Sequence, residues 1–167
     1  TLHRENLREV LEDLSVTGIS EAELDHLNMV WHRLNPWPDS VPGLTRLKTK
    51  FILATMSNGN VKLMVDMAKH GGLPWDMSLG AEIAQSYKPD PETYLAGCRM
   101  LRLAPEECMM VAAHNSDLVA ARALGLKTAF IARPTEYGPE QKVDFKAEHD
   151  FDVIADTMEG VADKLGC

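Results

Sequence analysis

The stretch Phe51-Ile52-Leu53-Ala54-Thr55-Met56-Ser57-Asn58-Gly59 decides the fold, because an apolar run is followed at once by small polar residues. A continuous apolar run of this kind is typical of a strand that is buried on both faces. Ser, Asn and Gly then favour a turn and the start of a helix, which we predict over residues 60–70. The stretch therefore predicts the first strand and helix of an α/β unit.

The same alternation continues toward the end of the chain. Apolar strands alternating with helices form a parallel sheet that is covered on both faces, so we predict an α/β fold of this type. The sequence predicts further strands at 77–79, 108–113, 127–132 and 151–155, and helices at 91–101, 116–124 and after residue 155.

The first 38 residues follow a different, purely helical pattern. Apolar residues recur at helical spacing up to Leu14, and Ser20-x-x-Glu23 is a capping box that opens a second helix, expected to reach Leu34. Residues 36–43 contain three prolines and a glycine, so we predict a connector there. We therefore expect two parts, a helical hairpin over 1–38 and an α/β part over 39–167.

Composition excludes several classes of function. The 167 residues include 17 Lys and Arg against 25 Asp and Glu, a net charge of −8, which argues against general binding to nucleic acid phosphates. No apolar stretch approaches the ~20 residues of a membrane span. Three widely spaced cysteines favour free thiols over a disulfide framework or a zinc site. We expect no nucleic acid partner, no membrane association and a cytoplasmic location.

Three loops follow predicted strands at the edge where ligands bind in such sheets. Ser57-Asn58-Gly59-Asn60 could bind an anion at a helix N-terminus, although ordinary helix capping explains the same residues. Lys88-Pro89-Asp90-Pro91 fixes a lysine that could hold a carboxylate, the alternative being a solvated surface lysine. In His114-Asn115-Ser116-Asp117 the aspartate is equally well explained as a helix cap, and a lone histidine is a poor indication of a metal.

In this order and spacing, the three loops resemble the second, third and fourth motifs of the haloacid dehalogenase superfamily. The likeness runs from the connector to near the end of the chain. Within the superfamily the chain is more similar to the type II enzymes, the metal-independent L-2-haloacid dehalogenases, and the supporting stretches include 34–39 and 133–138. The resemblance implies a Rossmann-like core, with the hairpin as the latter part of a helical cap subdomain.

The fourth motif separates two branches of the superfamily. Its phosphatases usually carry Gly-Asp-x-x-x-Asp there, and those acids bind Mg²⁺ through hard oxygen ligands. This chain has Ala112 and Ala113 at the first two positions, and alanine cannot ligate a metal. The resemblance therefore implies no metal and no cofactor. A related phosphatase or phosphonate hydrolase and a catalytically inert fragment remain the alternatives.

By the resemblance, an aspartate displaces halide from a short 2-haloalkanoic acid, and water then hydrolyses the ester to a 2-hydroxy acid. The substrate is thus a small halogenated carboxylic acid. Ser57 would bind its carboxylate and Asn58 the departing halide, and Tyr94 would lie close to the nucleophile. Trp37 could form an apolar wall of the pocket, although packing between cap and core explains it at least as well.

The same resemblance assigns the remaining catalytic roles. Lys88 would orient the nucleophilic carboxylate, and Asp117 would hold Lys88 or the hydrolytic water in place. Ala112 and His114 stand where the family usually has Ser and Asn. Since Ala112 cannot bind water, His114 or Asn115 would have to position or activate it.

The nucleophile itself has no counterpart in the sequence. No Asp-x-x-Gly-Thr follows an apolar strand anywhere in the chain. We expect that aspartate and its strand to come from sequence before residue 1 or from a partner, so that this chain alone is inactive. The resemblance also implies a homodimer.

Overall fold

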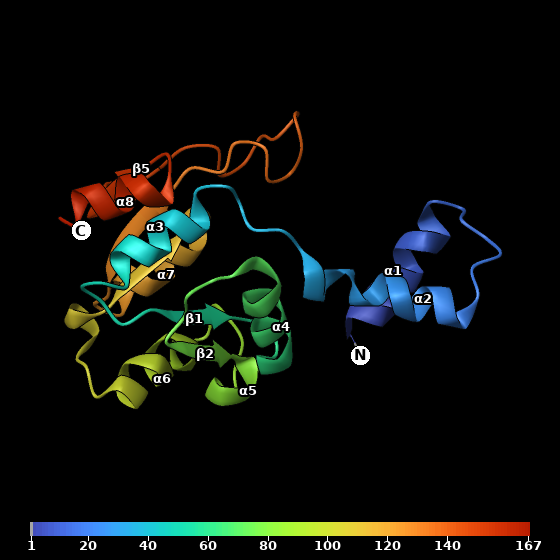
Figure 1. The fold of residues 1–167 in the computed structure, drawn as a ribbon, viewed down its shortest axis with the longest axis horizontal. Helices are drawn as coiled ribbons and strands as arrows, with labels where there is room; N and C mark the ends of the chain where they lie inside the picture. Colours follow the sequence, from blue (N-terminus) through green and yellow to red (C-terminus); the bar gives the residue numbers. More distant parts are fainter. Residues whose placement is uncertain (1) are drawn as a thin grey trace.

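The computed structural model describes residues 2–167, which form a helical arm joined to a layered α/β body (Figure 1). The arm consists of α1 (Leu2–Asp13), α2 (Glu21–Asn28) and the 3₁₀ helix η1 (Met29–Arg33). The predicted capping box is present at Ser20. The prediction of a single helix to Leu34 is wrong at its end, because the last turns tighten into 3₁₀ geometry, as is frequent at helix C-termini. Residue 1 of the predicted hairpin lies outside the described residues.

The connector between arm and body is shorter than predicted, because α3 (Ser40–Leu47) begins inside the proline-containing segment. Pro42 lies in the first turn of α3, where a missing N–H leaves no intrahelical bond unmade. Gly43 lets α3 approach α8 (Met158–Lys164) closely, since a Cβ at this position would lie 2.6 Å from the backbone carbonyl carbon of Met158. The C-terminal helix is therefore packed against the segment that leads out of the arm.

The five strands are all parallel, as predicted, but they form two separate sheets. β1 (Ala54–Ser57) pairs with β2 (Met77–Gly80). β3 (Met109–Ala112), β4 (Lys127–Ile131) and β5 (Val153–Ala155) form the second sheet in that order. Residues 128–131 of β4 are buried, whereas all of β1 is only half-buried. The sheet is thus interrupted between β1 and β3.

Helices pack on these strands and confirm the α/β fold class. The predicted helices at 60–70, 91–101 and 116–124 are found within one residue of their expected bounds, whereas α3 and two short helical turns had no counterpart among the predictions. Between β1 and β4 the helical elements are, in chain order, α4 (Val61–Gly71), α5 (Ala81–Ala84), α6 (Pro91–Leu101), the 3₁₀ turn η2 (Pro105–Glu107) and α7 (Asn115–Ala123). One core cluster joins α6, α7 and β4 through Tyr94, Leu118 and Phe130, and a second joins α3 and α8 to β4 and β5. A long irregular segment, 132–152, returns from β4 to β5 (Figure 1).

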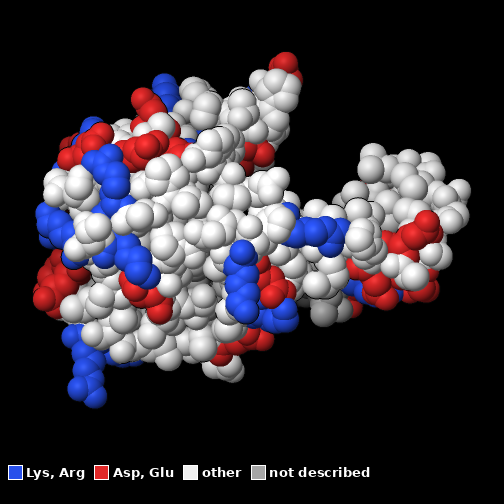
Figure 2. Space-filling model, in the orientation of Figure 1, with Lys and Arg blue, Asp and Glu red and all other residues white. Residues whose placement is uncertain are grey.

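The surface carries charges of both signs. On the face shown in Figure 2, Lys and Arg lie next to Asp and Glu over much of the body. In the arm, Arg4 and Arg8 both pair with Glu21. No helix in residues 2–167 combines the length and the apolar character needed to cross a membrane.

Candidate active site

Lys88, Tyr94 and Asp117 form one hydrogen-bonded cluster, which brings together the second and third of the three loops. Lys88 Nζ donates to Asp117 Oδ2 at 2.7 Å, and the Tyr94 hydroxyl donates to Oδ1 at 2.7 Å. The Lys88 and Asp117 side chains are only 16% and 14% exposed. Burial, and then the bond to Asp117, raise the pKa of Tyr94 well above its usual value, so the phenol keeps the proton that it donates. In this cluster the carboxylate of Asp117, itself held by Tyr94, fixes the position of the Lys88 ammonium.

The first loop is tied to the second through Asn58. Its Oδ1 accepts the backbone N–H of Lys88 at 2.7 Å, and its Nδ2 donates to the Lys88 carbonyl at 3.4 Å. Beyond Lys88, Asp90 caps α6 by accepting the N–H of Glu92 at 2.9 Å. Both ends of the lysine loop are therefore held, and the amide of Asn58, predicted to meet a halide, binds the backbone of Lys88 in this structure.

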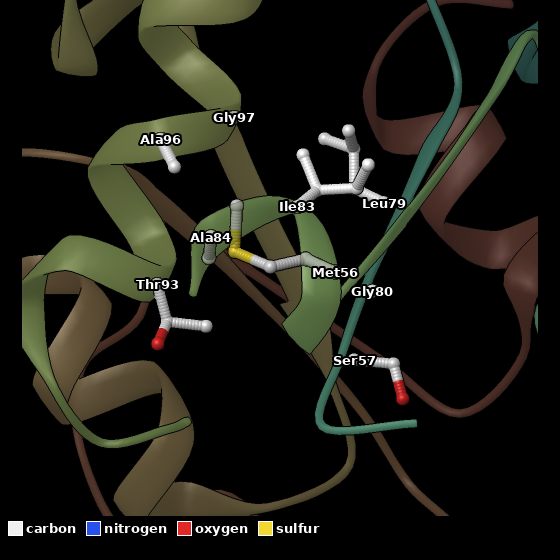
Figure 3. Close-up of a pocket in the computed structure, with 9 residues that line it drawn as sticks. All are labelled: Met56, Ser57, Leu79, Gly80, Ile83, Ala84, Thr93, Ala96 and Gly97. Atoms are coloured by element: carbon white, nitrogen blue, oxygen red, sulfur yellow. The ribbon is translucent and has the colours of Figure 1, made fainter. Parts of the chain in front are cut away.

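Ser57 lies at the end of β1, where its hydroxyl accepts the N–H of Gly59 at 3.0 Å. A small hollow of about 10 Å³, roughly the space of one water molecule, lies beside it, between the ends of β1 and β2 and the helices α5 and α6 (Figure 3). Apart from Ser57 and the buried Thr93, the lining is apolar or glycine: Met56, Leu79, Gly80, Ile83, Ala84, Ala96 and Gly97. The hollow does not include Lys88, His114 or Asp117, so the polar cluster defines the candidate site.

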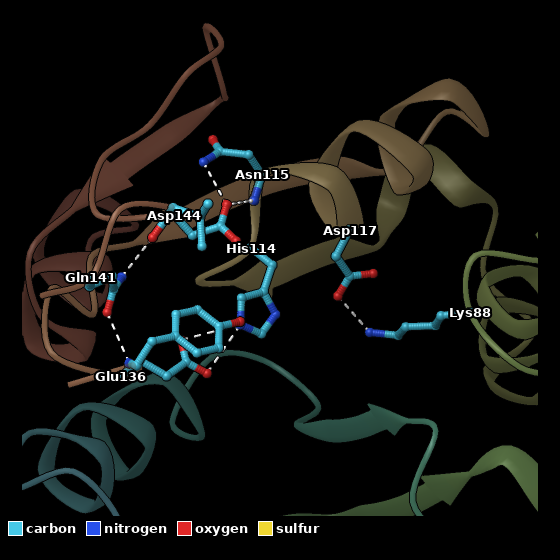
Figure 4. Close-up of polar contacts among 9 residues, drawn as sticks. Lys88, His114, Asn115, Asp117, Glu136, Gln141 and Asp144 are labelled. Carbon is cyan, nitrogen blue, oxygen red and sulfur yellow. Dashed lines mark hydrogen bonds and ion pairs between the residues drawn. The ribbon is translucent and has the colours of Figure 1, made fainter.

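Asn115 is buried and holds the segment that follows β4. Its backbone N–H and its Nδ2 both donate to Asp144 Oδ1 at 2.9 Å (Figure 4). Nδ2 also donates to the Lys146 carbonyl at 3.1 Å. Its Oδ1 accepts the N–H of Glu148 at 2.9 Å. Asp144 has a φ of +55°, a left-handed conformation that Asp tolerates better than most residues. The amide of Asn115 is thus fully engaged with protein atoms.

His114 has a different environment, because its ring reaches the surface. Its Nε2 lies 3.1 and 3.2 Å from the two carboxylate oxygens of Glu136 and 3.2 Å from the hydroxyl of Tyr137. The other ring nitrogen, Nδ1, is turned away from Glu136, to the side on which Asp117 and Lys88 lie (Figure 4). Of the two residues predicted to position or activate water, His114 has a ring nitrogen, Nδ1, that makes no hydrogen bond within the described residues, whereas Asn115 is buried. Residues 2–167 contain no group of three His, Cys, Asp or Glu side chains placed to share one metal ion.

Trp37 contacts the core through Arg133, whose guanidinium carbon lies 4.9 Å from the centre of the indole ring. Arg133 is buried, and its Nη2 donates to Asp39 Oδ2 at 3.0 Å. Burial alone would raise the pKa of Asp39, but the bonds from the Met158 N–H and from Arg133 outweigh it and lower that pKa. Trp37 is 39% exposed, and within residues 2–167 its indole ring makes no hydrogen bond or cation–π contact with Lys88, Tyr94 or Asp117.

Sequence reasoning did not identify three polar residues of this region: Asp39, Glu136 and Asp144. Glu136 lies in the stretch 133–138, which the resemblance had already brought out, and it follows β4 at the same edge as the other loops. The available signal was therefore its position after a strand. No local pattern indicates that Asp39 or Asp144 bonds to residues 94 and 29 positions away.

Known proteins resemble the chain in both sequence and structure. A crystal structure of an L-2-haloacid dehalogenase is 52% identical, with a TM-score of 0.95 over 99% of this chain and 70% of that one. A defluorinating L-2-haloacid dehalogenase is 48% identical, again with a TM-score of 0.95, over 99% of this chain and 69% of that one.

Curated relatives are more distant and longer than this chain. The (S)-2-haloacid dehalogenase of Xanthobacter autotrophicus is 26% identical over 115 residues, which are 68% of this chain and 45% of the relative. Phosphatases also occur among such relatives. The chain spans about half the length of the curated relatives that it matches.

The family is settled by the match along most of the chain. The family described as haloacid dehalogenase-like hydrolase matches residues 2–125, a range that includes the loops of Ser57, Lys88 and Asp117. With this match and the 52% identity to a solved dehalogenase, the chain belongs to the haloacid dehalogenase-like hydrolases.

Proposed function

We propose that the protein containing this chain hydrolyses short 2-haloalkanoic acids to 2-hydroxy acids through an ester on an aspartate. The observation that carries the proposal is the buried cluster of Lys88, Tyr94 and Asp117, in which the ammonium of Lys88 is fixed by the carboxylate of Asp117. An ammonium held in this way stabilises a nucleophilic carboxylate beside it and keeps its position through the reaction. The two dehalogenases with TM-scores of 0.95 support the same substrate class.

The nucleophile enters the proposal from outside these 167 residues. The sequence has no aspartate in the required motif, and β1 and β3 belong to separate sheets, so we place the strand that would carry this aspartate between them. A strand placed there would end beside the loops of Ser57 and His114, at the carboxyl edge of both sheets.

In the first step, the carboxylate attacks the carbon bearing the halogen, and halide leaves with the bonding electrons. Ser57 binds the carboxylate of the substrate, Asn58 assists halide departure, and Lys88 orients the nucleophile. Tyr94 and Asp117 hold Lys88 in place through the two bonds at 2.7 Å. In the second step, water attacks the ester with His114 as its base. Asn115 then stabilises the loop through Asp144.

No metal is assigned to either step, because Ala113 replaces the acid that would bind Mg²⁺. The runner-up function is a phosphatase or phosphonate hydrolase of the same family, which the distant phosphatase relatives favour. We further propose a cytoplasmic homodimer, with Trp37 against the apolar part of the substrate pocket.

The test measures halide release by the intact protein from 2-chloro- and 2-bromopropionate in the presence of EDTA. Halide release is expected from the wild type, and Lys88→Ala should lower it on the order of 100-fold. Lys62→Ala is the matched control, because that lysine lies on the surface of α4 and pairs only with Asp66 among the described residues. Phosphate release from phosphomonoesters with Mg²⁺, without any halide release, would exclude the proposal and favour the phosphatase.

A further inference from the structure

We propose that Glu136 is a positioning residue that fixes the tautomer and orientation of His114 for hydrolysis of the ester. The inference rests on the proposed function and extends it to a residue after β4. It starts from the two oxygens of Glu136 at 3.1 and 3.2 Å from His114 Nε2.

The contact determines which ring nitrogen carries the proton. An ionised carboxylate only accepts hydrogen bonds, so Nε2 must be protonated and donate to Glu136. In the neutral imidazole the lone pair is then on Nδ1, the nitrogen turned toward Asp117 and Lys88 (Figure 4). The ring thus directs its basic nitrogen toward the catalytic cluster.

Tyr137 limits the ring from the same side. Burial, followed by the charges of Glu136 and Asp144, raises the pKa of Tyr137, so its hydroxyl stays neutral beside Nε2. The centres of the two rings are 6.2 Å apart. His114 is therefore contacted by two residues that are neighbours in the sequence, the carboxylate of Glu136 and the aromatic ring of Tyr137.

Glu136 lies in a turn whose backbone is fixed by hydrogen bonds. Its backbone N–H donates to the Arg133 carbonyl at 3.2 Å, and Arg133 is anchored in turn to Asp39. On the other side, the N–H of Tyr137 donates to Gln141 Oε1 at 3.0 Å, and the N–H of Gly138 donates to the Thr135 carbonyl at 3.0 Å. The carboxylate is therefore presented by a fixed backbone.

A contribution to folding stability does not explain the contact between His114 and Glu136. The side chains of His114 and Glu136 are 39% and 31% exposed, and even a fully charged pair with this much exposure contributes little to the free energy of folding. What the contact does determine is the direction of the imidazole, which matters for a base and not for packing.

The chemical step is ester hydrolysis. The water oxygen bonds to the ester carbonyl carbon while His114 Nδ1 takes one proton of the water. The bond from that carbon to the alkoxy oxygen then breaks, and the alkoxy oxygen receives the proton from His114 as the 2-hydroxy acid leaves. The carboxylate reforms as the second proton of the water passes to solvent. Glu136 supports the imidazolium that exists between the two transfers.

The experiment uses the intact protein and separates halide release from ester hydrolysis. Glu136→Gln keeps the size of the side chain and removes its charge. We expect an unchanged burst of one halide per site, a steady-state kcat lowered about tenfold, and an ester visible in the intact mass. Tyr137→Phe should give a smaller decrease of the same kind. Glu140→Gln, an exposed acid of the same segment, is the matched control and should keep the wild-type kcat.

The outcomes separate the two proposals. A wild type that releases no halide overturns the proposed function. A wild type that releases halide, combined with a Glu136→Gln variant that hydrolyses its ester at the wild-type rate, overturns the role of Glu136 alone. Loss of the burst itself in Glu136→Gln would also contradict it, because positioning of the water base acts only after halide has left.

Discussion

Substituting Tyr94 by Phe tests whether its hydroxyl fixes Asp117. Tyr94 is fully buried, and its hydroxyl donates to the carboxylate at 2.7 Å. A hydrogen bond to a charged group contributes about 1.5–3 kcal/mol, and the carboxylate of Asp117 is too buried for water to replace the lost donor fully. We expect Tyr94→Phe to lower the free energy of unfolding by about 2 kcal/mol. For a protein of this size the corresponding decrease in Tm is about 4–8 °C.

The measurement is urea unfolding of the intact protein, followed by circular dichroism, with Asp117→Asn and the double variant completing a cycle. The change should be in the midpoint and not in the slope. In the Asp117→Asn background, Tyr94→Phe should cost much less, because the charged acceptor is gone. A loss below about 0.5 kcal/mol in the wild-type background, or equal losses in both backgrounds, would refute the reasoning.

Three further predictions concern the frame around the site. Gly43→Ala should lower the free energy of unfolding by about 1–3 kcal/mol, measured by thermal melts. The added Cβ would lie 2.6 Å from the Met158 backbone, and this clash costs more than the roughly 1 kcal/mol gained in helix propensity. Asp39→Asn should cost about 3 kcal/mol at neutral pH by leaving Arg133 buried without a carboxylate. Because the pKa of Asp39 is lowered below 3.8 on folding, that difference should persist above pH 3.8 and shrink as the pH falls through the folded value, in urea titrations at each pH. Burial, and then the neighbouring Cys98, raise the pKa of Cys108 to about 12. At pH 8 the reactive thiolate is then roughly 1,000-fold scarcer in the folded than in the unfolded protein, so iodoacetamide should label Cys108 far more slowly in the folded protein, as read by peptide mass.

The sequence predicts the repeating α/β units well, because their signals are local. The apolar run before Ser57 and the proline at the start of α6 each determine the structure within a few residues of themselves. The start of α3 was missed because Pro42 was interpreted as a helix breaker, although the first turn of a helix accepts proline.

The candidate site was predictable in part. The family resemblance implied that Asp117 holds Lys88 or the hydrolytic water, and in the structure the Lys88 and Asp117 side chains lie 2.7 Å apart. The partners of His114 and Asn115 could not be predicted, because Glu136 and Asp144 lie in the irregular segment 132–152, whose path no periodic pattern describes. Sequence reasoning also could not separate these two neighbouring residues, of which Asn115 is buried and His114 is only half-buried.

The interruption between β1 and β3 has a consequence for how the body opens. No ladder pairing joins the two sheets, so the strands of either sheet can lose their backbone hydrogen bonds while the other sheet keeps its own, and amide exchange can proceed in two cooperative units. Ser57, Asn58 and Lys88 belong to the first unit, and His114 and Asp117 belong to the second. The hydrogen bond from Lys88 to Asp117 joins the two units, so it can form only when both units are folded and correctly placed relative to each other.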